Sequence, residues 1–357
     1  MFFEFLQVAL GNRSCLSRTL AADEWLYLYE ESQRHALKGI AFMGLSRLPK
    51  EQRPGVEVLA NWYHASEMIK KQSQLLNKRA AEACQFFWQE GIDCCVMKGQ
   101  AVARFYSDPL LRNSGDIDLW VNTSPQNLQR VAQKHGLNLS GRNYIHYHFP
   151  LFDDVEVEAH FRPSYFCNPM LNRRLQRYFE QEKAQQFASK HSFADDSGFI
   201  GVPTLKFDYI YILLHIARHF FSRGIGLRQF LDYYYVMQQP ISEAERENVI
   251  MQLRRFKLQR LTKAVMYVLQ QVFGLENQFL LVEPDVAEGE FLLREVMRSG
   301  NFGDFDDRLR PIGSEPALMR FSRSMRRNAH FVFHYPSEML WVPLFRTKEY
   351  LQRQMIK

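Results

Sequence analysis

Hydrophobic and polar residues alternate along this 357-residue chain with two different periods. From residue 22 to about residue 90, apolar residues recur every three or four positions, which predicts helices that each bury one face. Similar spacing returns beyond Pro163. Between these two regions, short stretches alternate apolar and polar residues with a period of two, as strands do. The pattern predicts an α+β fold in which helices flank a small mixed β-sheet.

Punctuating residues divide this pattern into three parts. Pro49 and Pro54-Gly55 interrupt the first helices, and Gly91 ends the last of them. We therefore predict an N-terminal helical region over residues 1–88, an α+β core over 89–165 and a C-terminal helical domain over 166–357. The apolar residues 1–10 include an acid and no basic leader, so we interpret them as a docking helix and not as a signal peptide.

Acidic residues recur on the predicted strands. Over residues 116–121, Asp116 and Asp118 alternate with apolar positions, so both carboxylates lie on one face of a strand. Two like charges so close together repel each other unless a cation lies between them, and hard cations such as Mg2+ prefer oxygen ligands. Residues 154–161 alternate in the same way and carry Glu158. If the two strands are neighbours in one sheet, Glu158 completes a metal clamp.

A glycine turn precedes the acidic strand. Residues 92–97 form a short buried strand, and Lys98-Gly99 then turn the chain into a helix from Gln100 to about Tyr106. A glycine at such a turn lets a phosphate approach the backbone amides, and a neighbouring lysine neutralises its charge. The turn alone is a weak signal, and the aspartates downstream strengthen it.

These segments together resemble the uncharacterised nucleotidyltransferase family, within the superfamily that has a DNA polymerase β-like catalytic core. That family carries Leu-Lys-Gly, Asp-Pro-x-x-Arg, Asp-h-Asp-h-h-Val and acid-h-His-Trp segments, where h is apolar. The matching residues are Lys98-Gly99, Asp108-Pro109 with Arg112, residues 116–121, and residues 158–161. Gln100 departs from the superfamily, which usually has serine or glycine there. The resemblance implies transfer of a nucleoside monophosphate from an NTP such as ATP to a hydroxyl acceptor, with release of pyrophosphate.

The resemblance also implies roles for individual residues. Asp116, Asp118 and Glu158 are the expected catalytic residues and the expected ligands of two Mg2+ or Mn2+ ions that bind together with the NTP, and Glu158 is also a candidate proton acceptor. Arg112 is expected to stabilise the departing pyrophosphate. The expected nucleotide and phosphate contacts are Lys98, Gly99, Gln100, Arg112, Ser114 and His160. The acceptor is a small molecule, a protein side chain or an RNA end.

Two alternative functions stay open beside this one. The first is a catalytically degenerate protein that only binds nucleotide or a protein partner, and Gln100 favours it. The second is a nucleic-acid-binding protein, because four arginines stand at helical spacing near the C-terminus and the net charge is +6 with a pI near 9.0. Such a stripe also suits a membrane surface, although a solvated helix face is its commoner use. The four residues are Arg320, Arg323, Arg326 and Arg327.

Several histidines and a further arginine have alternative roles. His146, His148 and His160 suggest either a zinc site or, for the first two, a place near bound phosphates. His215 and His219 are expected in the core of an apolar helix. Arg228 and Asp232, four residues apart, are expected to pair on a helix surface, and contact with a base or phosphate is the less common alternative.

The cellular compartment is predicted from two features, the length of the apolar runs and the spacing of the cysteines. No apolar run approaches the length of a membrane span. The five cysteines fit neither zinc spacing nor a disulfide framework. We therefore expect a cytoplasmic protein with reduced thiols.

Overall fold

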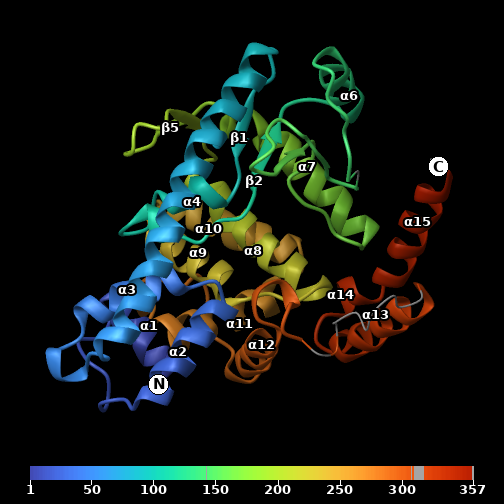
Figure 1. The fold of residues 1–357 in the computed structure, drawn as a ribbon. Coiled ribbons are helices and arrows are strands. Elements are labelled where there is room, and N and C mark those ends of the chain that lie inside the picture. The colour runs from blue at the N-terminus through green and yellow to red at the C-terminus, as the bar shows by residue number, and fades with distance from the viewer. Residues whose placement is uncertain (142, 307, 309–316, 356–357) are drawn as a thin grey trace.

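The computed structural model describes residues 1–141, 143–306, 308 and 317–355. Four N-terminal helices are followed by a small sheet and then by a series of further helices (Figure 1). This arrangement confirms the predicted α+β class. The N-terminal helices are α1 (Phe2–Leu10), α2 (Ala22–Arg34), α3 (Lys38–Arg47) and α4 (Val56–Gln89), with a 3-10 turn η1 at Lys50–Gln52.

The 34-residue helix α4 connects the N-terminal helices to the sheet (Figure 1). It begins after Pro54-Gly55 and ends at Gly91, whose φ of +69° is a left-handed conformation that glycine adopts without strain. There the N–H of Ile92 donates to the carbonyl of Phe87, as in a Schellman motif. The chain thereby reverses directly into the first strand.

Four strands form one mixed sheet in the order β1-β2-β4-β3. Strand β2 is antiparallel to β1 and parallel to β4, and β4 is antiparallel to β3. The apolar face of the sheet packs with α4 and α6 in a hydrophobic cluster of its own. The strands and the short helices between them are β1 (Cys94–Val96), α5 (Gly99–Ala103), η2 (Pro109–Leu111), β2 (Ile117–Val121), α6 (Pro125–Lys134), β3 (His146–His148) and β4 (Val157–His160).

The opposite face of the sheet is also covered. Trp120 of β2 is buried and stacks on Phe207, with ring centroids 5.4 Å apart and planes inclined by 20°. Phe207 belongs to α8 (Leu205–Ser222), which follows α7 (Pro169–Gln186). The part of this face around Trp120 is therefore covered by α8 and, through Phe179, by α7.

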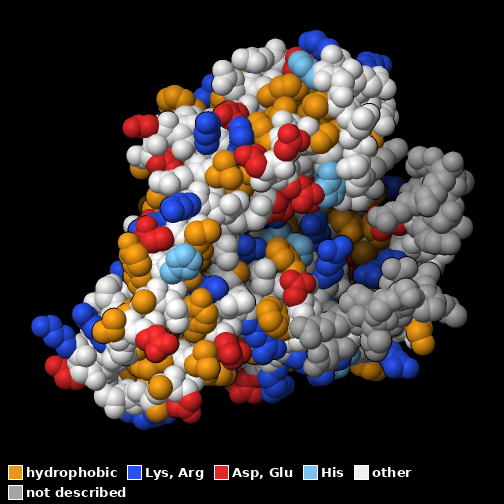
Figure 2. All heavy atoms as spheres, viewed as in Figure 1, with side chains coloured by type: hydrophobic (Ala, Val, Ile, Leu, Met, Phe, Trp, Pro, Cys, Tyr) orange, Lys and Arg blue, Asp and Glu red, His pale blue; other side chains and the backbone are white. Residues whose placement is uncertain are grey.

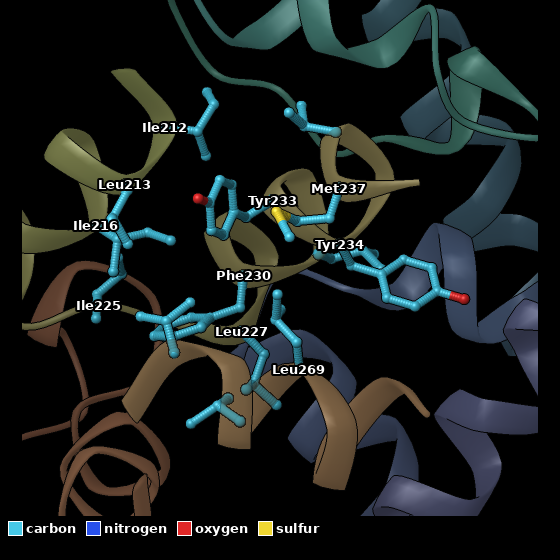
Figure 3. Packing of buried hydrophobic residues seen from close by; sticks show 14 of the residues in the cluster. Ile212, Leu213, Ile216, Ile225, Leu227, Phe230, Tyr233, Tyr234, Met237 and Leu269 are labelled. Carbon is cyan, nitrogen blue, oxygen red and sulfur yellow. The ribbon is translucent and has the colours of Figure 1, made fainter. Parts of the chain in front are cut away.

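The C-terminal helices pack around α8 and α9 (Leu227–Met237). Figure 3 shows apolar side chains from both helices pointing toward one another and toward Leu269. One hydrophobic cluster continues from here to Phe5 and Trp25 in the N-terminal helices. The predicted division into three parts remains a prediction, and the outer two share this core. The remaining helices are α10 (Glu243–Arg255), α11 (Gln259–Val268), the π-helix η3 (Leu269–Phe273), η4 (Asn277–Phe279), α12 (Val286–Ser299), η5 (Asn301–Gly303), α13 (Ala317–Val332), α14 (Pro336–Met339) and α15 (Val342–Met355).

The structure differs from the predicted elements in several details. Strands β5 (Lys190–Ser192) and β6 (Phe199–Gly201) form a two-stranded hairpin within the region predicted as helical. Helix α5 ends at Ala103, three residues earlier than predicted. No helix among the described residues is both long and apolar enough to cross a membrane.

The predicted basic stripe on α13 is wrong for one of its members. Arg327 is only 7% exposed, donates from Nη2 to the backbone carbonyl of Phe220 at 2.7 Å, and lies over the ring of Phe331. Arg326 is exposed, Arg323 is partly buried, and the side chain of Arg320 lies outside the described part of the structure. Helical spacing alone did not reveal that the core lies on the side of Arg327.

Candidate functional site

Three carboxylates converge on the inner face of the sheet. Asp118 and Glu158 are directly paired in the register of β2 and β4, and Asp116 lies two residues before Asp118. One carboxylate oxygen from each residue lies within 4.8 Å of the others. Asp118 is 3% exposed, whereas Asp116 and Glu158 are partly exposed. The structure therefore brings together the three acidic residues that the sequence singled out.

The charges of these acids influence one another strongly. The neighbouring charge of Asp118, together with burial, raises the pKa of Asp116. Burial alone would raise the pKa of Asp118 as well, but the Lys98 ammonium and a hydrogen bond with His160 bring it below its ordinary value. The charges of Lys98 and Arg228 oppose the rise in the pKa of Asp116 only in part, so a bound cation would relieve the remaining repulsion.

Lys98 supplies the positive charge nearest to Asp118. Its Nζ lies 2.6 Å from Oδ2 of Asp118, and its side chain is almost fully buried. The backbone of Lys98 has φ 49° and ψ −148°, a conformation that L-residues rarely adopt, and Gly99 follows with φ +47°. The turn predicted from Lys98-Gly99 is therefore a strained turn that points the ammonium at the aspartates.

Two histidines hold the acids from the side of β3 and β4. Nε2 of His160 lies 3.0 Å from Oδ1 of Asp118 and 3.0 Å from Oε2 of Glu158. Nδ1 of His146 lies 2.8 Å from the same Glu158 oxygen. His148, on the same face of β3, is paired with Glu156 instead. The three rings pack edge to face in a row, with His146 in the middle, and His146 and His160 are the two that reach the three carboxylates.

These contacts shift the pKa values of Glu158 and of the two histidines. Burial opposes ionisation of Glu158, but hydrogen bonds from His146 and His160 bring its pKa well below the ordinary value. Burial would lower the pKa of His160, but Asp118 and Glu158 raise it. Burial lowers the pKa of His146, which leaves that ring neutral near pH 7. A carboxylate with so low a pKa binds cations well and accepts protons poorly.

The sequence suggested that Arg112 contacts the departing pyrophosphate, but in the structure it contacts protein side chains. Its guanidinium makes two contacts with the carboxylate of Asp232, at 2.8 and 2.7 Å, and a third with Oγ of Ser114 at 2.5 Å. Tyr106 donates to the same carboxylate at 2.6 Å. Arg112 thus contacts both Ser114 and α9, and its charge is balanced by Asp232.

Arg228 and Asp232 do not form the surface pair that their spacing predicted. Asp232 is buried and engaged by Arg112, while Nη1 of Arg228 donates to the backbone carbonyl of Asn113 at 2.5 Å. The prediction was wrong because the side of α9 that carries both residues packs against the segment preceding β2. Both arginines therefore anchor that segment, which ends at Asp116.

Gln100 is buried at the start of α5, at the position where the superfamily usually has serine or glycine. It is 3% exposed, and neither Oε1 nor Nε2 has a hydrogen-bond partner among the described residues. An unsatisfied buried amide costs about 1–3 kcal/mol, so this side chain is suited to a polar ligand or water. The residue that departs from the superfamily pattern thus has unused hydrogen-bonding capacity.

Sequence reasoning missed the helical side of the site. Tyr211, His215 and Arg218 recur at positions i, i+4 and i+7 of α8, a polar stripe on an otherwise apolar helix. The charges of Asp118 and Glu158 add to burial in raising the pKa of Tyr211. After burial, the charge of Lys98 is the largest cause of the low pKa of His215. The charges of the acids and of Lys98 therefore act on Tyr211 and His215 of this stripe.

The site therefore has an acidic side on the sheet and a basic side on the helices. Among the residues that the structure describes, the guanidinium of Arg218 has no hydrogen-bond or ion-pair partner, while its backbone carbonyl accepts from Oγ of Ser222. Figure 2 shows acidic and histidine side chains gathered in the middle of the face drawn, beside a hollow whose walls carry basic and histidine side chains. An anion that also binds a cation, as a metal-bound polyphosphate does, fits between two such walls.

A groove lies along α7. It has a volume of about 820 Å3 and runs between α7 and α15. Its lining includes Tyr144, which precedes His146 by two residues, and the aromatic side chains Trp341 and Phe345. A second cavity of about 380 Å3 lies near Trp120. Neither cavity is lined by the three carboxylates.

Comparison with known families decides which class of protein this site belongs to. Residues 21–274 match the model of a family described as uncharacterised nucleotidyltransferase. The chain belongs to this nucleotidyltransferase family. The match extends from α2 to the end of the π-helix η3 and includes all the site residues described above. Membership implies a nucleotide substrate, and the acidic cluster is a group that could hold a metal ion.

The other comparisons add little to the assignment. Among solved structures, this chain is similar to the crystal structure of an antigenic nucleotidyltransferase-like protein from Paracoccidioides brasiliensis. That likeness has a TM-score of 0.32 and 14% sequence identity, and covers 54% of this chain and 91% of the other. No curated protein matches the chain. The family assignment rests on the sequence match.

Proposed function

We propose that this protein transfers a nucleotidyl group from an NTP to an acceptor hydroxyl and releases pyrophosphate. The observation that supports this most is the convergence of Asp116, Asp118 and Glu158 within 4.8 Å, on adjacent strands, beside the Lys98-Gly99 turn. Three carboxylate oxygens at this spacing are a ligand set for hard divalent ions. Transfer between phosphates depends mostly on positioning and on charge neutralisation, which such a site supplies.

The residues present fit a divalent ion. The donor atoms are all carboxylate oxygens, and repulsion from Asp118 raises the pKa of Asp116 although Lys98 and Arg228 oppose the shift. Asp116, Asp118 and Glu158 would hold Mg2+ or Mn2+. When bound, the ions would neutralise phosphate charge and lower the pKa of the acceptor hydroxyl.

The chain's own groups have separate roles in this proposal. Lys98 and Arg218 neutralise the triphosphate from opposite sides, and the unpaired amide of Gln100 is available to the nucleotide. Glu158 acts as a ligand and not as the proton acceptor, since His146 and His160 keep its pKa low. Arg112 acts through Asp232 to hold the segment before β2, and does not contact the departing pyrophosphate.

The decisive experiment follows the transfer of label. Purified protein is incubated with each α-labelled NTP, Mg2+ or Mn2+ and a cell extract, and Asp118→Asn is run in parallel. Label that moves to an acceptor only with the wild-type protein supports the proposal and identifies both substrates. If wild type and Asp118→Asn give the same pattern with all four NTPs, the proposal is wrong.

One observation favours a second function, binding of nucleotide without transfer. Nζ of Lys98 lies close enough to Oδ2 of Asp118 to take the place of a metal ion at that oxygen. A protein in which the ammonium keeps this position would bind NTP and release no pyrophosphate. Saturable NTP binding without pyrophosphate release in any extract, with either metal, would select this function.

A further inference from the structure

A second set of possible metal ligands shares one residue with the three carboxylates. His146, Glu158 and His160 each offer one ligand atom, and these atoms lie within 4.8 Å of one another. Both imidazole nitrogens point to the same carboxylate oxygen, Oε2 of Glu158. Glu158 therefore joins an all-oxygen set on one side to a set with two nitrogens on the other.

The distances within this second set match those between ligands of one metal ion. Nδ1 of His146 lies 2.8 Å from Oε2 of Glu158, Nε2 of His160 lies 3.0 Å from it, and the two nitrogens are 3.3 Å apart. Ligands bound at about 2.1 Å are separated by about 3.0 Å when they subtend a right angle and by about 3.4 Å at the tetrahedral angle. All three distances lie near this range.

The fold holds both rings in these positions. His146 and His160 are directly paired in the register of β3 and β4, and both are buried. The Asn143 side chain contacts Nε2 of His146 at 2.5 Å, which leaves Nδ1 of that ring facing Glu158. Contacts that fix the far side of a ligating imidazole are typical of metal sites in proteins.

We propose that His146, Glu158 and His160 form a binding site for a first-row transition ion such as Mn2+, Co2+ or Zn2+, next to the all-oxygen site. Imidazole nitrogen favours these ions over Mg2+, which prefers oxygen ligands. Metal binding at the nitrogen site stands by itself, and its use in catalysis rests on the proposed nucleotidyl transfer. The protein would then work with two different ions, and Glu158 would belong to both ligand sets.

The test measures direct nitrogen coordination. Metal-free protein is titrated with Mn2+ and examined by pulsed EPR, which detects coupling of the bound ion to 14N of imidazole, while Co2+ titration gives the affinity. We expect 14N coupling in the wild-type protein. Replacing both ligands, His146→Gln with His160→Gln, should abolish the coupling and weaken Co2+ binding by more than about tenfold.

Two variants serve as controls. His148→Gln changes a histidine on the same face of β3 that pairs with Glu156, so coupling and affinity should stay as in the wild type. Asp116→Asn removes a ligand of the all-oxygen set only, so it should abolish label transfer and keep the 14N coupling. Melting temperatures verify that each variant is folded.

The outcomes separate this inference from the proposed function. Coupling without label transfer would support the nitrogen site and refute nucleotidyl transfer. Label transfer with Mn2+ bound but no 14N coupling in the wild type would overturn the nitrogen site. In that case His146 and His160 only donate hydrogen bonds to the carboxylates, and nucleotidyl transfer stands.

Discussion

Asp118 and Glu158 face each other directly across parallel strands, although α6 and β3 lie between them in the sequence. Parallel neighbours need such a crossover connection, so the third carboxylate reaches the first two only when the whole core has folded. His160 then contacts both acids from two residues further along β4. The pairing of β2 with β4 is thus the structural condition for the site.

Neutralising Asp118 should abolish nucleotidyl transfer and leave the fold intact. Asp118→Asn keeps the shape of the side chain but removes a buried negative charge that a divalent ion needs. We expect label transfer to fall by about 10²–10³-fold, the size typical of losing one electrostatic contact in an active site. Steady-state assays with saturating metal measure the loss. An active Asp118→Asn protein would contradict the proposed role.

Lys98 combines a strained backbone with a buried charge, and two substitutions separate these features. Both Lys98→Gly and Lys98→Met remove the ammonium next to Asp118, but only glycine adopts φ 49° and ψ −148° without strain. We expect Lys98→Gly to have the larger free energy of unfolding, by about 1–3 kcal/mol. Urea denaturation of the two variants measures the difference. Equal stabilities would show that the turn stores no strain at this residue.

The buried ion pair of Arg112 and Asp232 should matter for stability. Both side chains are buried, so removing one partner leaves an uncompensated charge in the core. We expect Arg112→Met to lower the free energy of unfolding by about 3–5 kcal/mol, and a double variant with Asp232→Leu to regain much of it. Denaturant titrations test this cycle. Additive losses in the double variant would mean that the two residues act independently.

Glu338 should make stability depend on pH. Burial raises its pKa from 4.5 to about 7, although the N–H groups of Cys167 and Asn168 donate to it and oppose the shift. Because the pKa in the folded state is the higher one, the stabilising contribution is complete below pH 4.5 and is lost by about pH 7. The loss amounts to about 3 kcal/mol.

A matched variant isolates the contribution of Glu338. Glu338→Gln cannot ionise, so its free energy of unfolding should not show this loss between pH 4.5 and pH 8. Asp208 has a pKa that burial likewise raises to about 7, and it is unchanged in both proteins, so the difference between them reports Glu338 alone. Parallel pH curves for the two proteins would contradict this prediction.

The sequence was sufficient where short-range patterns determine the structure. Period-two alternation placed Asp116, Asp118 and Glu158 on strands, and the glycine turn after β1 followed from Lys98-Gly99. Alternation gives the face of a strand but not its neighbours. The pairing of β2 with β4 is a contact between distant parts of the chain, so the sequence could suggest it only as a condition for the metal clamp.

The sequence failed where a partner far along the chain decides the role of a residue. Arg112 seemed to be available for phosphate because its motif places it before the acidic strand, but Asp232, on α9, takes up its charge. The polar stripe around Arg218 was visible as spacing on α8, yet only the packing of that helix against the sheet face reveals what it faces. The sequence therefore identified the charged residues but not the groups that they contact.

Helix α1 packs on the π-helix η3, so residues 2–10 and 269–273 help to build the same hydrophobic core. During synthesis α1 can pack at once on its near neighbours, because Phe5 contacts the rings of Trp25 and Trp62. The side of α1 that faces η3 is covered only after residues 269–273 have been made. Removing residues 2–10 would therefore uncover apolar surface on η3, far along the chain from the deletion.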